Sequence, residues 1–226
     1  VVRGEDDVGV GELARRCQRV HQLPDRTVDG LQRAQTSAVV LDDLVAVDML
    51  APPMRDFLAA AVSVGLSVLV SGGTQAGKTT LLRAMAGLDG NPGLLATHGV
   101  SVSLALQRAA DQLAESTVGD FVASDAALAR LAELGADLDP DEHPLDLPAA
   151  HLRLAQLAQV FDQERELVLL DEPDVGLDTP NRARAHALIA DALARGAAVI
   201  LTCHDASFAA EVGEYAAVAE RELDAS

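Results

Sequence analysis

The chain has 226 residues, of which 49% are hydrophobic, so it is long enough and apolar enough to bury the core of one large domain. Its formal net charge of −18 at pH 7 disfavours polyanionic partners, and we expect no binding to nucleic acid. The two cysteines lie far apart and form no CxxC pair, so neither a disulfide framework nor a zinc site is indicated.

The first segment, residues 1–35, is polar, with weak helical periodicity over residues 10–20 and a break at Pro24. It has no signal-peptide pattern. The longest apolar stretch, residues 57–70, is shorter than the roughly 20 residues that a membrane-spanning helix needs. We therefore expect a cytoplasmic protein, with residues 1–35 as an extension of unknown role before a domain over residues 36–226. Since there is no initiator methionine, the chain can also be a fragment.

The next segment contains elements that precede a glycine-rich loop. Residues 38–41 are predicted to form a short strand, and residues 52–66 a helix that begins with proline, which is tolerated in a first helical turn. Residues 67–73, SVLVSGG, predict a buried strand that runs into a glycine turn. Helical periodicity follows over residues 78–88, so the loop lies between a strand and a helix.

The loop itself, GGTQAGKTT, is predicted to bind a polyphosphate. Its glycines let the backbone approach phosphate oxygens, and successive N–H groups and the helix N-terminus face the anion. Lys78 is the single lysine of the chain and supplies a compact positive charge, while Thr79 can bind Mg²⁺. The nucleotide contacts are expected from Gly72, Gly73, Thr74, Gln75, Ala76, Gly77, Lys78, Thr79 and Thr80.

A helical subdomain is predicted after the loop. Residues 94–106 have strand character, and residues 108–135 show alanine-rich helical periodicity before an acidic loop at residues 136–146. A helix is expected from about residue 148 to 161. Together these patterns predict a short helical subdomain at about residues 108–160.

The remaining elements alternate between strand and helix. Residues 167–173, LVLLDEP, predict a second buried strand, and residues 180–195 a helix that Gly196 ends. Residues 197–202 predict another strand. Strands that alternate with helices indicate an α/β fold of the P-loop NTPase type, with a mostly parallel sheet flanked by helices.

Two carboxylates end the predicted strand at residues 167–173. Asp171 would reach Mg²⁺ through water, and Glu172 would polarise the attacking water. Neighbours in a regular strand point to opposite faces, so both side chains can serve one site only if the strand breaks there. Pro173 supports such a break, whereas the alternative is a strand end with two solvated acids.

The motif LVLLDEPDVGLD at residues 167–178, followed by a helix, the strand AAVILT and CHD at residues 203–205, resembles the ATP-binding cassette (ABC) ATPases. The resemblance implies that Asp171 and Glu172 are the Walker B pair, Asp178 the D-loop aspartate and His204 the switch histidine at the γ-phosphate. Residues 103–122 are similar to the Q-loop region of the family, particularly of the energy-coupling-factor importer ATPases. That similarity implies that Gln107 contacts the nucleotide and its magnesium.

The chain also departs from the family pattern. LPAAH at residues 147–151 stands where the family normally carries LSGGQ. Pro148 lacks a hydroxyl and an N–H, and Ala149 and Ala150 add methyl groups where close approach is needed. This segment is either a degenerate signature or has no signature function. No aromatic residue precedes Phe57, so the usual adenine-stacking tyrosine is missing.

The leading hypothesis is an ABC-type ATPase subunit that binds MgATP, with Lys78, Glu172 and His204 as catalytic residues. It would pair with a second ATPase subunit, identical or different, and would power integral membrane transporter subunits from the inner face of the cell membrane. Residues 39–82 are similar to the traffic ATPases of type II and type IV secretion, which makes a ring ATPase the alternative. A nucleotide-binding module with little catalysis is a third possibility.

Overall fold

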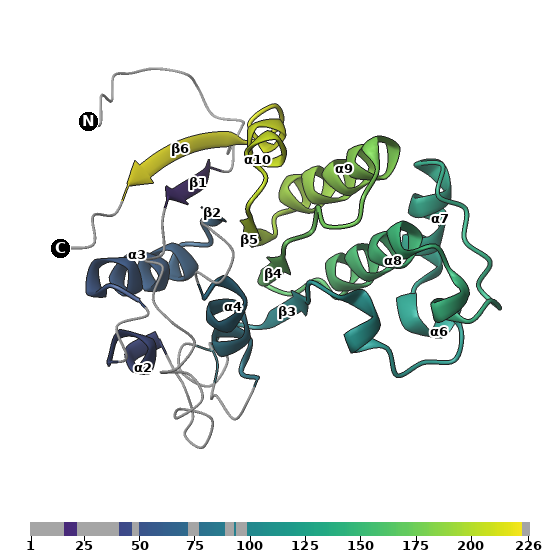
Figure 1. Cartoon of the computed structure of the whole chain (residues 1–226), viewed down its shortest axis with the longest axis horizontal. Helices are drawn as coiled ribbons and strands as arrows, with labels where there is room; N and C mark the ends of the chain where they lie inside the picture. Colours follow the sequence, from purple (N-terminus) through teal and green to yellow (C-terminus); the bar gives the residue numbers. More distant parts are fainter. Residues whose placement is uncertain are drawn as a thin grey trace.

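The computed structural model describes residues 16–21, 41–46, 50–71, 77–88, 93 and 99–222. In this part of the chain six strands form one sheet in the order β3-β4-β5-β2-β1-β6, and every neighbouring pair is parallel (Figure 1). The strands are β1 (Arg16–His21), β2 (Ser67–Ser71), β3 (Val102–Ala105), β4 (Leu167–Asp171), β5 (Ala198–Cys203) and β6 (Ala217–Glu222).

Helices cover both faces of the sheet, as Figure 1 shows. One face packs against α2 (Leu41–Ala46), α3 (Pro52–Ser63) and α4 (Lys78–Ala86). The other packs against α8 (Ala149–Asp162), α9 (Thr179–Arg195) and α10 (Ala206–Val212). The segment before α8 adds the short helices η2 (Ala109–Gln112), α6 (Val118–Val122), α7 (Asp125–Glu133) and η3 (Pro144–Asp146).

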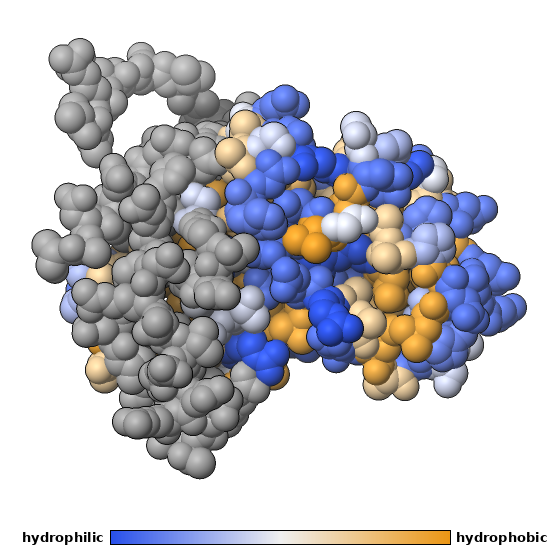
Figure 2. All heavy atoms as spheres, viewed as in Figure 1, coloured by the Kyte–Doolittle hydropathy of each residue, from blue (hydrophilic) through white to orange (hydrophobic). Residues whose placement is uncertain are grey.

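The alternation of β4 explains why this sheet has two cores. Leu167 and Leu169 belong to the core beneath α3 and α4, whereas Val168 and Leu170 belong to the core beneath α8 and α9. Successive side chains of a strand point to opposite faces, so an all-apolar strand must be covered on both. The predicted fold class is therefore confirmed. Figure 2 shows that the described part of this view has a polar surface interrupted by apolar patches.

Local capping sets the bounds of α9. The Asp178 carboxylate accepts a hydrogen bond from the Asn181 backbone N–H at 3.0 Å, which caps the first turn. Gly196 ends the helix with a φ of 118°, a left-handed conformation that glycine adopts easily. The helix expected at residues 180–195 and the strand expected at residues 197–202 are both confirmed.

Three expectations need correction. The helix expected over residues 10–20 is wrong for residues 16–20, which lie in β1 between β2 and β6, because tertiary pairing outweighs weak local propensity. Residues 10–15 lie outside the described residues. Leu41 begins α2 and is not in a strand, while residues 38–40 lie outside the described residues. The strand expected at residues 94–106 is confined to β3, with residues 94–98 outside the described part.

The alanine-rich segment at residues 108–135, where helical periodicity was predicted, is divided among the short helices η2, α6 and α7. Thr117 and Ser124 each accept a hydrogen bond from a backbone N–H three residues later, and so begin α6 and α7. Ala123 adopts a φ of 57° between them, which ends α6. The expected boundary at residue 35 falls outside the described residues. No helix among the described residues is long and apolar enough to cross a membrane.

Shortening a core side chain of β4 tests this packing. We expect Leu169→Ala to lower the free energy of unfolding by about 2–5 kcal/mol, because Leu169 is fully buried and a cavity would remain. Leu145→Ala is the matched control, since Leu145 is 60% exposed and should change stability by less than about 0.5 kcal/mol. Urea unfolding of both variants measures the difference, and equal losses would contradict the buried position of Leu169.

Candidate functional site

The carboxyl ends of three adjacent strands form the candidate site. The loop after β2 leads to Lys78 at the start of α4, β4 ends at Asp171, and β5 is followed by His204. Because β5 lies between β4 and β2 and all three are parallel, these residues share one edge of the sheet. Open α/β sheets bind ligands at this edge.

Three of the predicted residues meet at the carboxylate of Glu172. The Lys78 ammonium nitrogen lies 3.6 Å from Oε1, and His204 Nδ1 lies 3.6 Å from Oε2. The Gln107 amide nitrogen donates to Oε2 at 2.6 Å. Lys78 and Glu172 are buried, whereas the His204 side chain is 45% exposed. The structure thus brings together four residues that are far apart in sequence.

Asp171 lies beside this cluster and is almost fully buried. Its Oδ1 accepts a hydrogen bond from the Thr202 hydroxyl at 2.9 Å, while Oδ2 has no hydrogen-bond partner among the described residues. Burial raises the pKa of Asp171, and the hydroxyls of Thr79 and Thr202 oppose that rise. A buried carboxylate oxygen that lacks a protein partner is suited to a hard cation.

The backbone at Glu172 explains how both carboxylates serve one edge. Glu172 has a φ of 45°, a left-handed conformation that is uncommon outside glycine. Its N–H donates to the Thr202 carbonyl at 3.1 Å, so the turn remains attached to β5. The predicted break in the strand is confirmed, and the left-handed turn of Glu172 produces it directly before Pro173.

Arg153 of α8 braces this turn, and sequence reasoning missed it. One terminal guanidinium nitrogen, Nη2, donates to the carbonyls of Asp171 (2.8 Å) and Glu172 (2.5 Å). The other, Nη1, donates to the Leu106 carbonyl and to Gln156 Oε1, both at 2.5 Å. Burial lowers the pKa of Arg153 to about 10. The available signal was a charged residue among apolar neighbours in the helix at residues 148–161.

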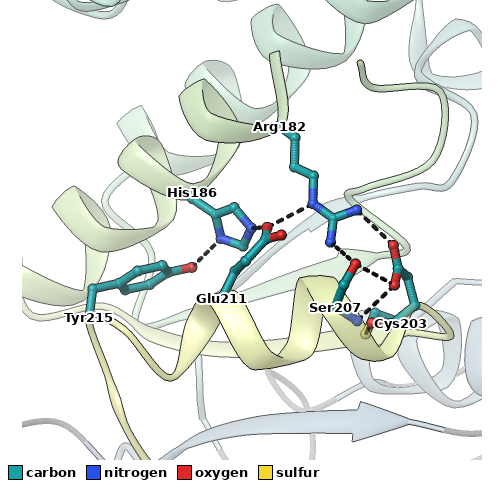
Figure 3. Close-up of polar contacts among 7 residues, drawn as sticks. Arg182, His186, Cys203, Ser207, Glu211 and Tyr215 are labelled. Atoms are coloured by element: carbon teal, nitrogen blue, oxygen red, sulfur yellow. Dashed lines mark hydrogen bonds and ion pairs between the residues drawn. The ribbon is translucent and has the colours of Figure 1, made fainter. Parts of the chain in front are cut away.

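The segment after His204 is held by the network in Figure 3. Arg182 of α9 donates to Asp205 Oδ2 and to Glu211 Oε2, each at 2.7 Å. His186 joins Glu211 at 2.7 Å and the Tyr215 hydroxyl at 2.8 Å. Hydrogen bonds from Arg182 and Ser207 hold the pKa of Asp205 well below its usual range. This network fixes α9 to α10 and so restrains the strand end that bears His204.

The other predicted residues are placed differently. Asp178 does not join the cluster, because its carboxylate caps α9. Gly77 has a φ of 75° and precedes α4, a conformation that favours glycine. Thr79 is exposed and Thr80 half-buried in the first turn of α4. The expected contacts from residues 72–76 lie outside the described residues.

Residues 147–151 lie at the N-terminal end of α8, whose first residue is Ala149. Pro148 is its N-cap residue, and no side-chain hydrogen bond caps this end among the described residues. Pro148 and Ala149 are exposed, while the Pro148 carbonyl accepts hydrogen bonds from the backbone of His151 and Leu152. The segment that stands in place of the family signature is therefore a surface helix start.

Comparison with known proteins assigns the family. The chain is 34% identical over 208 residues to the aliphatic sulfonates import ATP-binding protein SsuB 2 of Frankia alni, which covers 83% of this chain and 74% of that protein. It is 36% identical over 129 residues to the energy-coupling factor transporter ATP-binding protein EcfA2 of Lactobacillus delbrueckii, covering 51% and 44%. No protein-family model matches.

A further relative and a solved structure agree with this result. The chain is 34% identical over 173 residues to an ABC transporter ATP-binding protein of Streptomyces coelicolor, but it spans only 31% of that protein's length. A solved ATP-binding subunit of an ABC transporter has the same fold, with a TM-score of 0.55 at 18% identity, over 71% of this chain and 78% of that one. As the sequence motifs predicted, the chain belongs to the ATP-binding proteins of ABC transporters, which are P-loop ATPases.

Proposed function

We propose that the chain binds MgATP at this sheet edge and hydrolyses it as one subunit of a transporter ATPase dimer. The convergence of Lys78, Gln107 and His204 on the Glu172 carboxylate is the observation that carries the proposal. One partly buried cluster thus contains an ammonium that can bind phosphate oxygens, a carboxylate that can orient water, and an imidazole at the exposed edge of the cluster.

The residues around Asp171 fit Mg²⁺. Asp171 offers a buried oxygen, Oδ2, that accepts no hydrogen bond from the described residues, and the Thr79 hydroxyl lies near the same carboxylate. Both are oxygen ligands of the kind that Mg²⁺ prefers. When bound, Mg²⁺ neutralises charge on the phosphate oxygens. Gln107 remains a predicted contributor to the magnesium site. Its amide nitrogen donates a hydrogen bond to Glu172, which keeps its side chain beside the site.

Glu172 is the proposed general base. Its carboxylate is mostly buried, with a cation on one oxygen and Gln107 and His204 on the other, so its orientation is fixed. A fixed carboxylate can orient water and accept its proton. Lys78 then serves the phosphates, and the half-exposed His204 lies where it can contact the outermost phosphate of the substrate.

The proposed partner subunits are inferred from the family and from the residues at the start of α8. In an ABC dimer, each ATP lies between the phosphate loop of one subunit and the signature of the other. We propose that the second ATPase subunit differs from this chain and supplies an intact signature, because Pro148, Ala149 and Ala150 offer a poorer one. The chain would then support hydrolysis at its own loop while attached to integral membrane subunits at the inner face of the membrane.

Replacing the general base tests the chemistry. We expect Glu172→Gln to lower ATP turnover by about 10²–10⁴-fold while ATP still binds, because the amide cannot accept the proton. Turnover is measured with a partner subunit that has an intact signature, and binding with a fluorescent ATP analogue. Asp137→Asn, an exposed surface change, is the control and should leave both unchanged. Undiminished turnover in Glu172→Gln would rule out the proposed base.

Restoring the signature tests the asymmetric dimer. We expect the isolated chain to turn over slowly, and the combined change Pro148→Ser, Ala149→Gly, Ala150→Gly and His151→Gln to raise its turnover at least about tenfold, since backbone donors then reach the phosphate. Rapid turnover by the unmodified chain alone would contradict the asymmetric model.

The alternative of a ring ATPase rests on the similarity of residues 39–82 to secretion ATPases. The observation that supports this alternative is that α3 precedes β2 within that segment. Light scattering after size exclusion in ATP distinguishes the two assemblies. A dimer mass is expected, and a stable hexamer would favour the ring.

The Arg182–Asp205 ion pair gives a pH-dependent prediction. The pKa of Asp205 is lower in the folded state than in the unfolded state. Its contribution to the free energy of unfolding is therefore complete above the unfolded pKa of about 3.9 and is lost as the pH falls below that value. We expect Asp205→Asn to lower the unfolding free energy by up to about 1 kcal/mol at pH 7, a modest amount because the pair is partly solvated. Urea unfolding at pH 7 and pH 3.5 should show the difference shrinking, whereas a constant difference would contradict this assignment.

A further inference from the structure

We propose that Arg153 is a positioning residue that makes the geometry of Glu172 depend on the place of α8 and of the Gln107 segment. The inference rests on the proposed ATP hydrolysis, because it concerns the base of that reaction. Arg153 lies too deep to touch the substrate, being 3% exposed. It acts instead through hydrogen bonds to backbone carbonyls at the end of β4 and in the segment before Gln107.

The contacts of one guanidinium join three segments. Nη2 donates to the carbonyls of Asp171 and Glu172, so it holds the last residue of β4 and the first residue beyond it. Nη1 donates to the carbonyl of Leu106, the residue before Gln107. Arg153 itself belongs to α8. A planar fork with fixed donor directions can set these carbonyls relative to one another, which a point charge cannot.

The left-handed backbone of Glu172 needs such a brace. A residue other than glycine at a φ of 45° is strained unless its surroundings hold it. Arg153 holds the carbonyl side of Glu172 at 2.5 Å, and Thr202 holds the N–H side at 3.1 Å. If the Arg153 contact is lost, the peptide after Glu172 is free to relax, and the carboxylate leaves the position between Lys78 and His204.

Gln156 completes the link to the Gln107 segment. It lies one turn after Arg153 on α8, accepts from Arg153 Nη1 at 2.5 Å and donates to the Leu106 carbonyl at 3.1 Å. It also contacts the side chain of Gln112, which in turn accepts from the Leu106 N–H at 2.9 Å. Both polar groups of Leu106 are therefore tied to α8, directly or through one side chain, and Gln107 follows at once.

The buried guanidinium also balances charge. Asp171, Glu172 and Asp174 are all buried and lie near Arg153, and their charges oppose the fall in its pKa that burial causes. Simple charge balance would be satisfied by any cation, whereas positioning requires the fork. The substitution Arg153→Lys separates these two roles, because it keeps the charge and removes the fork.

The test compares Arg153→Lys and Arg153→Gln with Arg184→Gln, in the chain assembled with its intact-signature partner. Arg184 also donates to a backbone carbonyl, that of Leu134, but it lies outside the site. We expect both Arg153 variants to lose about 10–100-fold in kcat with the KM for ATP within about threefold, since a small misplacement of a reacting group has effects of this size. Arg184→Gln should keep full kcat. A kcat within twofold of the parent in either folded Arg153 variant would overturn the proposal.

A double-mutant cycle tests the link to Gln107. If Arg153 acts through the Gln107 segment and Glu172 together, Gln107→Ala should lower kcat much less in the Arg153→Gln background than in the parent. If the fold-loss of kcat in the double variant equals the product of the losses in the two single variants, the two residues act independently, and the link is overturned. Should Arg153→Gln fail to fold, Gln156→Leu replaces it in both tests, with a kcat loss of about tenfold expected and an unchanged kcat overturning the proposal.

Hydrogen exchange separates this inference from the proposed function. The Glu172 amide should exchange at least about tenfold faster in Arg153→Lys, while the amide of Leu169 within β4 keeps its protection. This readout needs no ATP turnover, so it holds even if the parent chain proves to be inactive, in which case the proposed function alone fails. Unchanged protection at Glu172 would overturn the positioning role.

Discussion

The left-handed turn at Glu172 is the constraint on which the site depends. In an extended strand, Asp171 and Glu172 would point to opposite faces of the sheet, one into each core. The positive φ ends β4 after Asp171 and places both carboxylates at the same edge. The residues around it then have defined tasks, because Thr202 holds the N–H of the turn, Arg153 holds its carbonyl, and Lys78 and His204 face the carboxylate.

Charge is distributed unevenly in this molecule. The chain carries a net charge of −18, yet the two cations nearest the buried acids, Lys78 and Arg153, are themselves buried. Buried carboxylates are tolerated only when they are paired or hydrogen-bonded. Asp171 relies on Thr202 and keeps one oxygen without a described partner, whereas Glu172 has three neighbours. The two adjacent acids differ in how far their oxygens are hydrogen-bonded, and this difference supports the roles proposed for them, Asp171 as a metal ligand and Glu172 as a base.

Much of the fold and part of the site follow from local patterns. Apolar runs with glycine or proline breaks predicted β2, β4 and β5 and the helices α4, α8 and α9. The phosphate-loop and strand-end patterns predicted Lys78 and Glu172, and the family resemblance predicted His204. What the pattern missed depends on tertiary contacts. β1 forms a strand because two neighbours pair with it, Asp178 caps its own helix, and Arg153 resembles the solvated charge of an amphipathic helix until the strand end it contacts is known.

Helix α8 has two tasks in the proposed dimer, and the structure separates them along its length. Its first turn, with Pro148 and Ala149 exposed, faces outward, where a signature would serve the partner's ATP. Its second turn carries Arg153 inward to the chain's own Glu172. Changes in the first turn therefore leave the brace of the chain's own site intact. A subunit can lose the outward task and keep the inward one, which is the physical basis for the proposed dimer with one hydrolysing site.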